Sequence, residues 1–297
     1  NTVSSMRNRL ARVAVVLGLC LPRLALAAPV ILDDLIGAWE FNGNADDTSG
    51  NGNHGTVSGA SLAADRFGNV QSAYAFDGDD HIRVADNPVL RPTAAMSATL
   101  WMKADALPGS FQVTHFLHKQ EFAGGNDYPG YWMRMDNNSS QCPGQYTVNG
   151  GVNVAGARRG DFACIDGTAL TDWRFLAMTY DGTSTRFYVD AVLVAEDIFS
   201  GTIEHSSMDL LIGSGPNVST TAFTGTIDDV YLYSDALTES ELSALYTATA
   251  VPGPALAVIF MLGIVAVLRN RRQSAFSPSP RQPRLRPSCA RFRPAVP

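Results

Sequence analysis

Short alternations of apolar and polar residues fill the middle of the chain, and glycine, asparagine and aspartate interrupt them. The clearest is segment 97–103, SATLWMK, in which Ala98, Leu100 and Met102 share one face. Segment 173–180, WRFLAMTY, is almost continuously apolar, as expected for a central strand covered on both faces. The same reasoning predicts further strands at 37–41, 72–76, 81–84, 111–119, 131–136, 185–190, 192–195, 209–213 and 223–233.

About a dozen strands in one block of roughly 220 residues favour an all-β fold, a jelly-roll sandwich of two antiparallel sheets, over two domains. The dipeptide Asp77-Gly78 suits a tight hairpin turn between the strands at 72–76 and 81–84. A short helix follows the last strand, and Thr238 with Glu241 predicts a capping box at its start. We expect Leu242 and Leu245 of this helix to seal one edge of the sandwich, and the last strand to pair near the first.

The N-terminal segment differs from this block. Three arginines between residues 7 and 12 precede an apolar run that ends at residue 21. The small-residue pattern Ala25-Leu26-Ala27 then offers a cleavage site. Residues 1–27 are therefore predicted to be a secretory signal peptide that starts at Met6, and residues 28–250 to be the exported domain.

The C-terminal segment is also distinct. Residues 255–268 are apolar or glycine, and Arg269, Arg271 and Arg272 follow them. The run is short for a bilayer span, but the trailing arginines fit a cytoplasmic flank, so we predict a membrane helix within 251–272. A buried core helix is the alternative. Residues 273–297, rich in proline, serine and arginine, are predicted to be disordered.

The charge of the exported domain narrows the classes of partner. The whole chain has a formal net charge of −6, yet residues 28–250 contain ten Lys and Arg against 28 Asp and Glu, a net charge of −18. A nucleic-acid-binding domain needs a basic footprint, so nucleic acid is excluded as a partner. An acidic exported domain suits calcium-rich surroundings.

Several short motifs follow one another along the chain: GAWEF at 37–41, DTSGNGNHG at 47–55, SAYAFDG at 72–78, LWMK at 100–103, FYVD at 187–190 and GTIDDV at 225–230. Together they resemble the concanavalin A-like jelly-roll domains of the laminin G-like group in bacterial exported proteins. One departure is Asp190-Ala191, where the family usually has Asp-Gly. A turn that needs positive φ would accept alanine at a cost of about 1 kcal/mol, unless the turn is of another type.

The segment 251–272 resembles a PEP-CTERM sorting signal, in which a proline motif precedes a short apolar helix and arginines. Here the motif reads Val251-Pro252-Gly253-Pro254, with glycine where the signature has glutamate. The resemblance implies an exosortase-type processing enzyme as a partner. It also implies a location at the cell surface, with the membrane as an anchor at least transiently.

The resemblance further implies a structural calcium ion. Asp228, in the last predicted strand, matches the position at which related sandwich enzymes and lectins hold calcium between the first and last strands. The polar loop 42–54 offers Asn42, Asp46 and Asp47, whose oxygens are of the kind that calcium takes. In the alternative, these loop residues form turns and Asp228 faces solvent.

The sequence lacks the catalytic motifs that are common in this fold and in hydrolases generally. Laminarinase-type hydrolases of this fold carry Glu-x-Asp-x-x-Glu on one strand, and no such motif occurs here. An HExxH zinc motif and a GxSxG elbow are also absent, and His115 and His118, three apart, would point to opposite faces of a strand. We expect a protein that is not an enzyme, with a divergent glycosidase as the alternative.

Cys142 and Cys164 are the cysteines of the exported domain, and 21 residues lie between them. In an exported protein such a pair predicts a disulfide bond, which would contribute about 3 kcal/mol by closing this loop. Two free buried thiols are the alternative.

Ligand contact is expected within residues 111–165, where aromatic and polar side chains gather. Tyr128 and Trp132 could stack on sugar rings, while Asn126, Asp127 and Arg134 bond the hydroxyl groups. Trp132 could instead be core packing, as such aromatics more often are. We therefore predict a surface-anchored recognition domain that binds a glycan such as an exopolysaccharide. The alternative is a structural or adhesive module that binds another surface protein.

Overall fold

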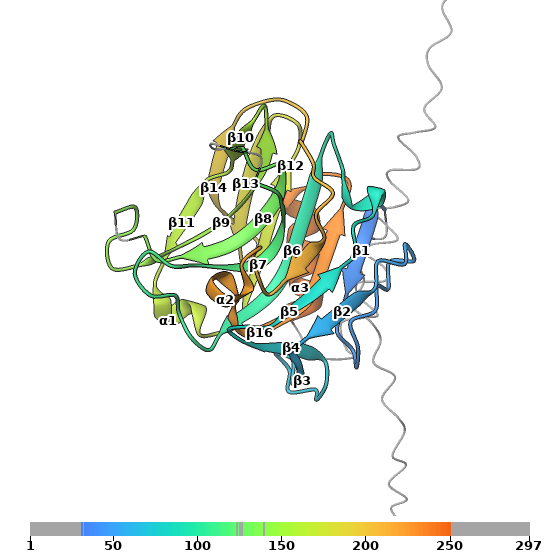
Figure 1. Ribbon diagram of the computed structural model, residues 1–297, viewed down its shortest axis with the longest axis vertical. Coiled ribbons are helices and arrows are strands. Elements are labelled where there is room, and N and C mark those ends of the chain that lie inside the picture. Colours follow the sequence, from blue (N-terminus) through green and yellow to red (C-terminus); the bar gives the residue numbers. More distant parts are fainter. Residues whose placement is uncertain (1–30, 32, 123, 125–126, 139, 251–297) are drawn as a thin grey trace, which may run out of the picture.

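The computed structural model describes residues 31, 33–122, 124, 127–138 and 140–250. In this part the chain folds into two antiparallel sheets that pack face to face (Figure 1). The predicted signal peptide, membrane helix and disordered tail lie outside the described residues, as does Asn126. Among the described helices, none is long and apolar enough to cross a membrane.

The first sheet, sheet A, has eight strands. They are β1 (Leu35–Trp39), β3 (Ser61–Ala63), β4 (Ala73–Asp77), β6 (Met96–Ala104), β12 (Arg174–Tyr180), β13 (Ser184–Val189), β14 (Val192–Ile198) and β16 (Thr224–Tyr233). Their order is β14-β13-β12-β6-β16-β4-β3, and β1 also pairs with β16. The last strand therefore pairs with the first, as predicted.

The second sheet, sheet B, also has eight strands. They are β2 (Gly55–Ser58), β5 (His81–Val84), β7 (Val113–Gln120), β8 (Gly130–Asp136), β9 (Tyr146–Val154), β10 (Ala157–Arg159), β11 (Phe162–Ile165) and β15 (Leu210–Ile212). Their order is β10-β9-β8-β7-β15-β5-β2, and β11 also pairs with β9. Four short or terminal helices complete the fold: η1 (Pro88–Leu90), α1 (Gly167–Leu170), α2 (Val218–Thr221) and α3 (Glu239–Ala250).

The core lies between the two sheets and is formed by alternate side chains of their strands. In β6, Ala98, Leu100 and Met102 are buried in this core, as their alternation predicts. The central strand β12 is covered on both faces, because Leu176 faces the core while Phe175 belongs to a second apolar cluster. The continuous apolar pattern of segment 173–180 thus reflects burial on two sides.

The second cluster lies on the outer face of sheet A, where α3 covers the strands. Thr238 caps this helix, since its backbone N–H donates to Glu241 at 2.9 Å and its Oγ1 accepts from the Glu241 N–H at 3.3 Å. The predicted capping box is confirmed. Leu242 and Leu245 are buried against Trp101 and its neighbours, so they cover a face of the sheet, and the prediction that they seal an edge was wrong.

The predicted hairpin at Asp77-Gly78 was also wrong. Strand β4 pairs with β3 and β16 in sheet A, whereas β5 pairs with β2 and β15 in sheet B. The chain therefore crosses from one sheet to the other here, and the positive φ of Gly78, 109°, serves a crossing turn. A dipeptide reports the local backbone bend, but it does not report which strands pair.

Strand β9 is absent from the predicted strands, because the glycines in TVNGGVNV weaken a strand pattern. Packing explains one of them. A Cβ atom at Gly150 would lie 3.1 Å from the Met178 Cβ atom of the opposite sheet. Close approach of the two sheets at β9 thus favours glycine over the β-branched residues that usually mark a strand.

Candidate functional site

The outer face of sheet B is the one on which polar and aromatic side chains gather. Strand β8 alternates, with Tyr131, Met133 and Met135 in the core and Trp132 and Arg134 on the outer face. Register places further strands beside it, since His118 lies opposite Trp132, and Trp132 opposite Gly151. We call this surface the open face; it comprises His115, His118, Gln120, Trp132, Arg134, Asn149, Asn153 and Arg158.

No helix comparable to α3 covers the open face in the part of the chain that the structure describes. The single-turn helix α2 lies near β7. The segment between β15 and α2 also approaches β7, since a Cβ atom at Gly215 would be 2.6 Å from His115 Nδ1. Elsewhere the face is bordered by the loop that carries Tyr128. One sheet is thus closed by its helix, and the other presents side chains outward.

Arg158 of β10 lies at the middle of the open face. Its guanidinium carbon is 4.2 Å from the Tyr128 ring centroid and 4.8 Å from that of Trp132. One of its nitrogens donates to Gln120 Oε1 at 2.5 Å, and Gln120 Nε2 donates to the Tyr128 carbonyl at 2.9 Å. Two aromatic rings and an amide therefore fix the guanidinium in place.

Trp132 supports this arrangement from below. Its exposed fraction is 4%, and its Nε1 donates to Asn149 Oδ1 at 3.0 Å. The ring lies on Gly151, where a Cβ atom would be 2.9 Å from two ring carbons. With Gly151 beneath it and Arg158 over it, Trp132 is a packed residue, which is the second of the two roles considered for it.

The other described residues predicted for ligand contact also lie on this side of sheet B. Arg134 Nε donates to Asn149 at 3.2 Å and is 3.5 Å from Asp136 Oδ2. Asp127 accepts from Asn153 Nδ2 at 2.8 Å. The structure thus brings Tyr128, Trp132, Arg134 and Asp127 together on one side of sheet B. The side chains of Trp132, Arg134 and Asp127 already form hydrogen bonds with the protein, to Asn149 or Asn153.

Sequence reasoning missed Arg158 and the two buried histidines. His115 and His118 lie on the same face with ring centroids 4.9 Å apart, so the expectation of opposite faces was wrong. The reason is a β-bulge between His115 and Leu117, which shifts the alternation by one residue. No residue type in this segment of the sequence predicts such a bulge.

Burial keeps both imidazoles neutral. Each has an exposed fraction of 4%. Burial, then the charges of His118, Arg134 and Arg158, holds the pKa of His115 well below its usual value, and the backbone of Thr221 opposes this shift. Burial, then the charge of Arg158, lowers the pKa of His118 to about 4.

Asp228, predicted to bind calcium, faces an arginine. Arg66 NH1 donates to Asp228 Oδ2 at 2.5 Å, and NH2 donates to Asp229 Oδ2 at 2.5 Å. The Arg66 guanidinium also lies 4.7 Å from the Trp101 ring centroid, and its Nε donates to the carbonyl of Thr249 in α3. Burial and then Asp229 raise the pKa of Asp228 well above its usual value, against the effect of Arg66.

The proposed loop ligands are also engaged. Asp47 accepts from the backbone N–H groups of Ala38, Ser49 and Asn53 at 2.8–3.0 Å. Asp46 accepts from the Asn44 side chain at 2.7 Å. Because Asp46 and Asp47 already receive donors and Asp228 faces Arg66, the three carboxylates and Asn42 do not fit a shared calcium ion in this arrangement.

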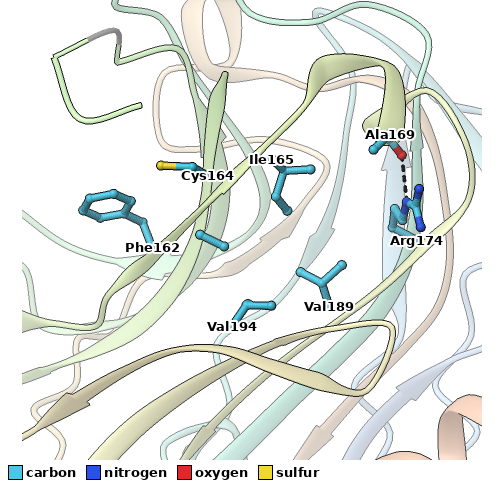
Figure 2. Close-up of a pocket in the computed structure, with 8 residues that line it drawn as sticks. Phe162, Cys164, Ile165, Ala169, Arg174, Val189 and Val194 are labelled. Carbon is cyan, nitrogen blue, oxygen red and sulfur yellow. Dashed lines mark hydrogen bonds between the residues drawn. The ribbon is translucent and has the colours of Figure 1, made fainter. Parts of the chain in front are cut away.

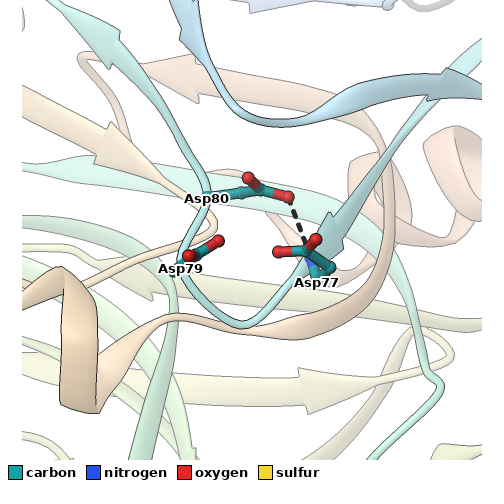
Figure 3. Close-up of side chains that lie close together, drawn as sticks. All are labelled: Asp77, Asp79 and Asp80. Carbon is teal, nitrogen blue, oxygen red and sulfur yellow. Dashed lines mark hydrogen bonds between the residues drawn. The ribbon is translucent and has the colours of Figure 1, made fainter.

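Three other carboxylates do converge in the described part of the chain. Ligand atoms of Asp77, Asp79 and Asp80 lie within 4.8 Å of one another in the crossing turn after β4 (Figure 3). Asp80 Oδ2 accepts the Asp77 N–H at 2.9 Å, so at least this carboxylate stabilises the turn itself. A hydrogen bond between the carboxyl groups of Asp77 and Asp79 raises the pKa of Asp79.

The predicted disulfide between Cys142 and Cys164 is confirmed, with their Cα atoms 5.5 Å apart. It ties the loop before β9 to β11. A shallow groove of about 480 Å³ lies nearby, between the edge strands β11 and β14 (Figure 2). Its lining is mainly apolar, and the Arg174 guanidinium within it is already paired with Asp190 at 2.7 Å. The groove therefore offers few groups that could orient a polar ligand.

Comparison with known proteins was made at the levels of sequence and structure. The family model of the concanavalin A-like lectin/glucanases superfamily matches residues 76–243, more than half of the chain. No curated protein sequence matches. Among solved structures, domain 4 of AbnA, a GH43 extracellular arabinanase from Geobacillus stearothermophilus in complex with arabinotriose, superposes with a TM-score of 0.52 and 21% identity. The match covers 72% of this chain and 98% of that domain.

Two toxin domains are similar as well. The binding domain of Paraclostridial Mosquitocidal Protein 1 gives a TM-score of 0.58 at 14% identity, over 73% of this chain and 53% of that one. The binding domain of Botulinum Neurotoxin DC in complex with SialylT gives 0.53 at 13% identity, over 74% and 52%. The chain spans about half the length of these toxin domains. At these identities the structural likeness shows a shared fold.

Proposed function

The chain belongs to the concanavalin A-like lectin/glucanases superfamily, and from this premise we propose that it is a non-catalytic domain whose open face binds a glycan. The observation that carries the proposal is the cluster around Arg158 on the outer face of the sheet that no long described helix covers, in which the Tyr128 ring, the packed Trp132 ring and the Gln120 amide fix the guanidinium. Sugars are bound by such combinations of aromatic faces and planar polar groups.

An accessible aromatic pair supports a stacking contact at the edge of this face. Phe122 has an exposed fraction of 64%, and its ring centroid is 5.1 Å from that of Tyr128. Tyr128 in turn contacts Arg158. A sugar ring placed on Phe122 and Tyr128 would have the guanidinium of Arg158 within reach. The arabinotriose in the AbnA domain is a further reason to expect an oligosaccharide.

A binding role rather than hydrolysis fits Asp136, the carboxylate beside Arg134 on this face. Asp136 is near Arg134 and also accepts a hydrogen bond from Thr147 and one from Asn149 at 3.4 Å. Glycoside hydrolysis uses two carboxyl groups that flank the bond to be cleaved. A carboxylate committed to three neighbours is better suited to positioning Arg134 than to attack or proton transfer.

A glycan array probed with the full chain tests the proposal, followed by calorimetric titration of the tightest ligand. We expect Phe122→Ala to weaken binding about fivefold, since an aromatic contact contributes about 1 kcal/mol. Phe111→Ala is the matched control, because Phe111 is 75% exposed but belongs to the segment before β7, away from Tyr128. Absence of any glycan ligand, or equal losses in both variants, would contradict the proposal.

Export supports the same role. The disulfide between Cys142 and Cys164 fits an oxidising compartment, as does the signal peptide predicted for residues 1–27. We propose that the protein is exported and displayed at the cell surface, with the segment 251–272 as its anchor and an exosortase-type enzyme as its processing partner. Structural calcium stays a prediction from the family resemblance, and an unchanged melting temperature on adding calcium after chelation would contradict it.

A second candidate function, binding of another surface protein, is favoured by the edge of sheet A. Strand β14 exposes Val192, Val194 and Ile198, at 63%, 40% and 79%. An edge strand with exposed apolar side chains is a common site for pairing with a partner chain. Ile198→Lys would then abolish association measured by light scattering while leaving glycan binding unchanged.

A further inference from the structure

We infer that the open face selects acidic glycans, whose sugars carry carboxylate or sulfate groups, and that Arg158 is the residue that reads the charge. This inference rests on the proposed glycan-binding function and specifies its ligand class.

Arg158 and Arg159 are exceptional among the cations of this acidic domain. The described residues include ten Lys and Arg, and eight of them lie within ion-pair distance of an Asp or Glu. Neither arginine of β10 forms an ion pair with a described carboxylate. In a domain with 28 acidic residues, a half-buried arginine without a carboxylate partner needs another explanation.

The hydrogen-bond capacity of Arg158 is also incompletely used. Its Nε atom is buried and has no hydrogen-bond partner among the described residues. Burial, then the charge of Arg134, lowers the pKa of Arg158 to about 10, so the guanidinium remains charged at neutral pH. A fixed, charged fork with unused donors matches a planar carboxylate or a sulfate, which can accept two parallel hydrogen bonds.

The two histidines beside Arg158 also have ring nitrogens without partners. His118 Nε2 faces the Gln120 carbonyl at 3.2 Å and therefore carries the proton of the neutral ring, so its unpartnered Nδ1 is a lone pair. Neither ring nitrogen of His115 has a hydrogen-bond partner among the described residues, and both imidazoles lie close enough to Arg158 and Arg134 for those charges to lower their pKa values. An anion bound here would gain a donor from His118 Nδ1 once the ring takes up a proton.

The carboxylates on this face contact groups other than Arg158. Asp136 is 3.5 Å from Arg134 and also accepts hydrogen bonds from Thr147 and Asn149. At the far end of the face, Asp127 and Glu204 both accept from Asn153 at 2.8 Å. Arg158 is thus a charged group without a carboxylate partner among the described residues, and an anionic group of a ligand could serve as its partner.

The aromatic neighbours strengthen the interaction that Arg158 could make. The Tyr128 and Trp132 ring centroids lie 4.2 and 4.8 Å from its guanidinium carbon and reduce its contact with water, and charge interactions strengthen where water is excluded. Because Gln120 already fixes the side chain, an incoming anion would not have to order it. An acidic sugar could therefore stack on Tyr128 while its charged group meets Arg158.

Acidic pH should strengthen this binding. An anion beside His118 favours the charged imidazole, so it raises the pKa of this residue from about 4 and couples ligand binding to proton uptake. The titratable and charged groups around it are His115 on β7, Arg134 and Asp136 on β8, Arg158 on β10 and Tyr128 in the adjoining loop. Affinity should therefore rise between pH 7 and pH 5.5.

Calorimetric titration of the full chain with matched ligand pairs tests the inference. One pair is an oligogalacturonate and the same oligosaccharide with its carboxyl groups reduced to alcohols; the other is a sulfated oligosaccharide and its unsulfated parent. We expect the acidic member of at least one pair to bind about tenfold more tightly. The pair that responds tells whether a carboxylate or a sulfate is read.

Variants locate the charge reader. Arg158→Gln should abolish the preference for the acidic member, and Arg158→Lys should retain part of it because it keeps the charge without the fork. Arg186→Gln is the control, since this arginine is paired with Asp181 and Glu196 on sheet A, and it should retain the full preference. Thermal unfolding of each variant shows that it is folded.

The outcomes separate the inference from the function on which it rests. Equal affinity for the acidic and neutral members overturns acidic selectivity and leaves glycan binding intact. A preference that survives Arg158→Gln overturns the role of Arg158. Failure of every oligosaccharide to bind overturns the proposed function itself.

Discussion

Ala191 is a residue whose backbone conformation is disfavoured by its side chain. It follows Asp190 in the two-residue turn between β13 and β14. The φ angle is 51° at Asp190 and 62° at Ala191. Both residues are thus left-handed, as in the type I′ turns that join paired strands and favour Asn or Asp followed by Gly. The sequence predicted this cost correctly, because the turn residues of a short hairpin carry their own geometry.

Ala191→Gly is therefore expected to raise the free energy of unfolding by about 1 kcal/mol, since glycine accepts positive φ without a Cβ penalty. Urea unfolding measures this gain. Ala195→Gly is the control, because Ala195 lies within β14 and is not left-handed. The control should destabilise the protein, and a loss of stability in both variants would contradict the account of the turn.

His118 is a second single residue that affects stability, because it makes the free energy of unfolding depend on pH. An unfolded histidine takes up its proton near pH 6.5, whereas folded His118 resists it down to about pH 4. The unfolded state therefore binds more protons in this window, and stability falls as the pH falls through it. This group alone should remove about 2 kcal/mol between pH 7 and pH 4.5. His118→Gln should reduce the loss measured by urea unfolding, and an equal loss in both proteins would contradict it.

At the scale of elements, the last strand depends on Arg66. Strand β16 pairs with β4 through Thr224–Ile227 and with β1 through Val230–Tyr233. Its bulge falls between these two partners, and there Asp229 has a φ of 46°. Adjacent residues of a regular strand point to opposite faces, so the bulge is what allows both carboxylates to meet one guanidinium.

Arg66→Met should lower the free energy of unfolding by about 3–5 kcal/mol, because two buried carboxylates would lose their counter-ion. Arg186→Met is the matched control, since its ion pairs are about one-third exposed and should contribute less than about 1 kcal/mol. Urea unfolding compares the two, and Arg66→Met with Asp228→Asn should recover part of the loss. Equal costs for the two single variants would contradict this role of Arg66.

What the sequence predicts at this scale follows from how each element is buried. Strand β6 shows a clear alternation because Ala98, Leu100 and Met102 face the core between the sheets while the polar Ser97 and Thr99 alternate with them, and the cap of α3 depends on Thr238 and Glu241 alone. Strand β9 was missed because close contacts favour its glycines, Gly150 against the opposite sheet and Gly151 against the Trp132 ring. The bulge in β7 and the crossing after Asp77 depend on pairing between distant segments, which no local pattern records.

At the scale of the molecule, the two sheets differ in what lies on their outer faces. Helix α3 covers sheet A (Figure 1). The residues around Arg158 lie on sheet B. The sequence placed Tyr128, Trp132 and Arg134 in one region, because they are close along the chain. It could not indicate Arg158, whose contacts come from a loop and two strands 26 to 38 residues earlier. Net charge also gave no indication of an arginine without a carboxylate partner inside an acidic domain.

A crystal structure of the protein soaked with the tightest-binding oligosaccharide tests the central claim most directly. The account predicts that the sugar lies on the open face, with a ring on Tyr128 and an anionic group within hydrogen-bond distance of the Arg158 guanidinium. A sugar bound in the groove between β11 and β14, or at the turn formed by Asp77, Asp79 and Asp80, with the open face vacant, would contradict it.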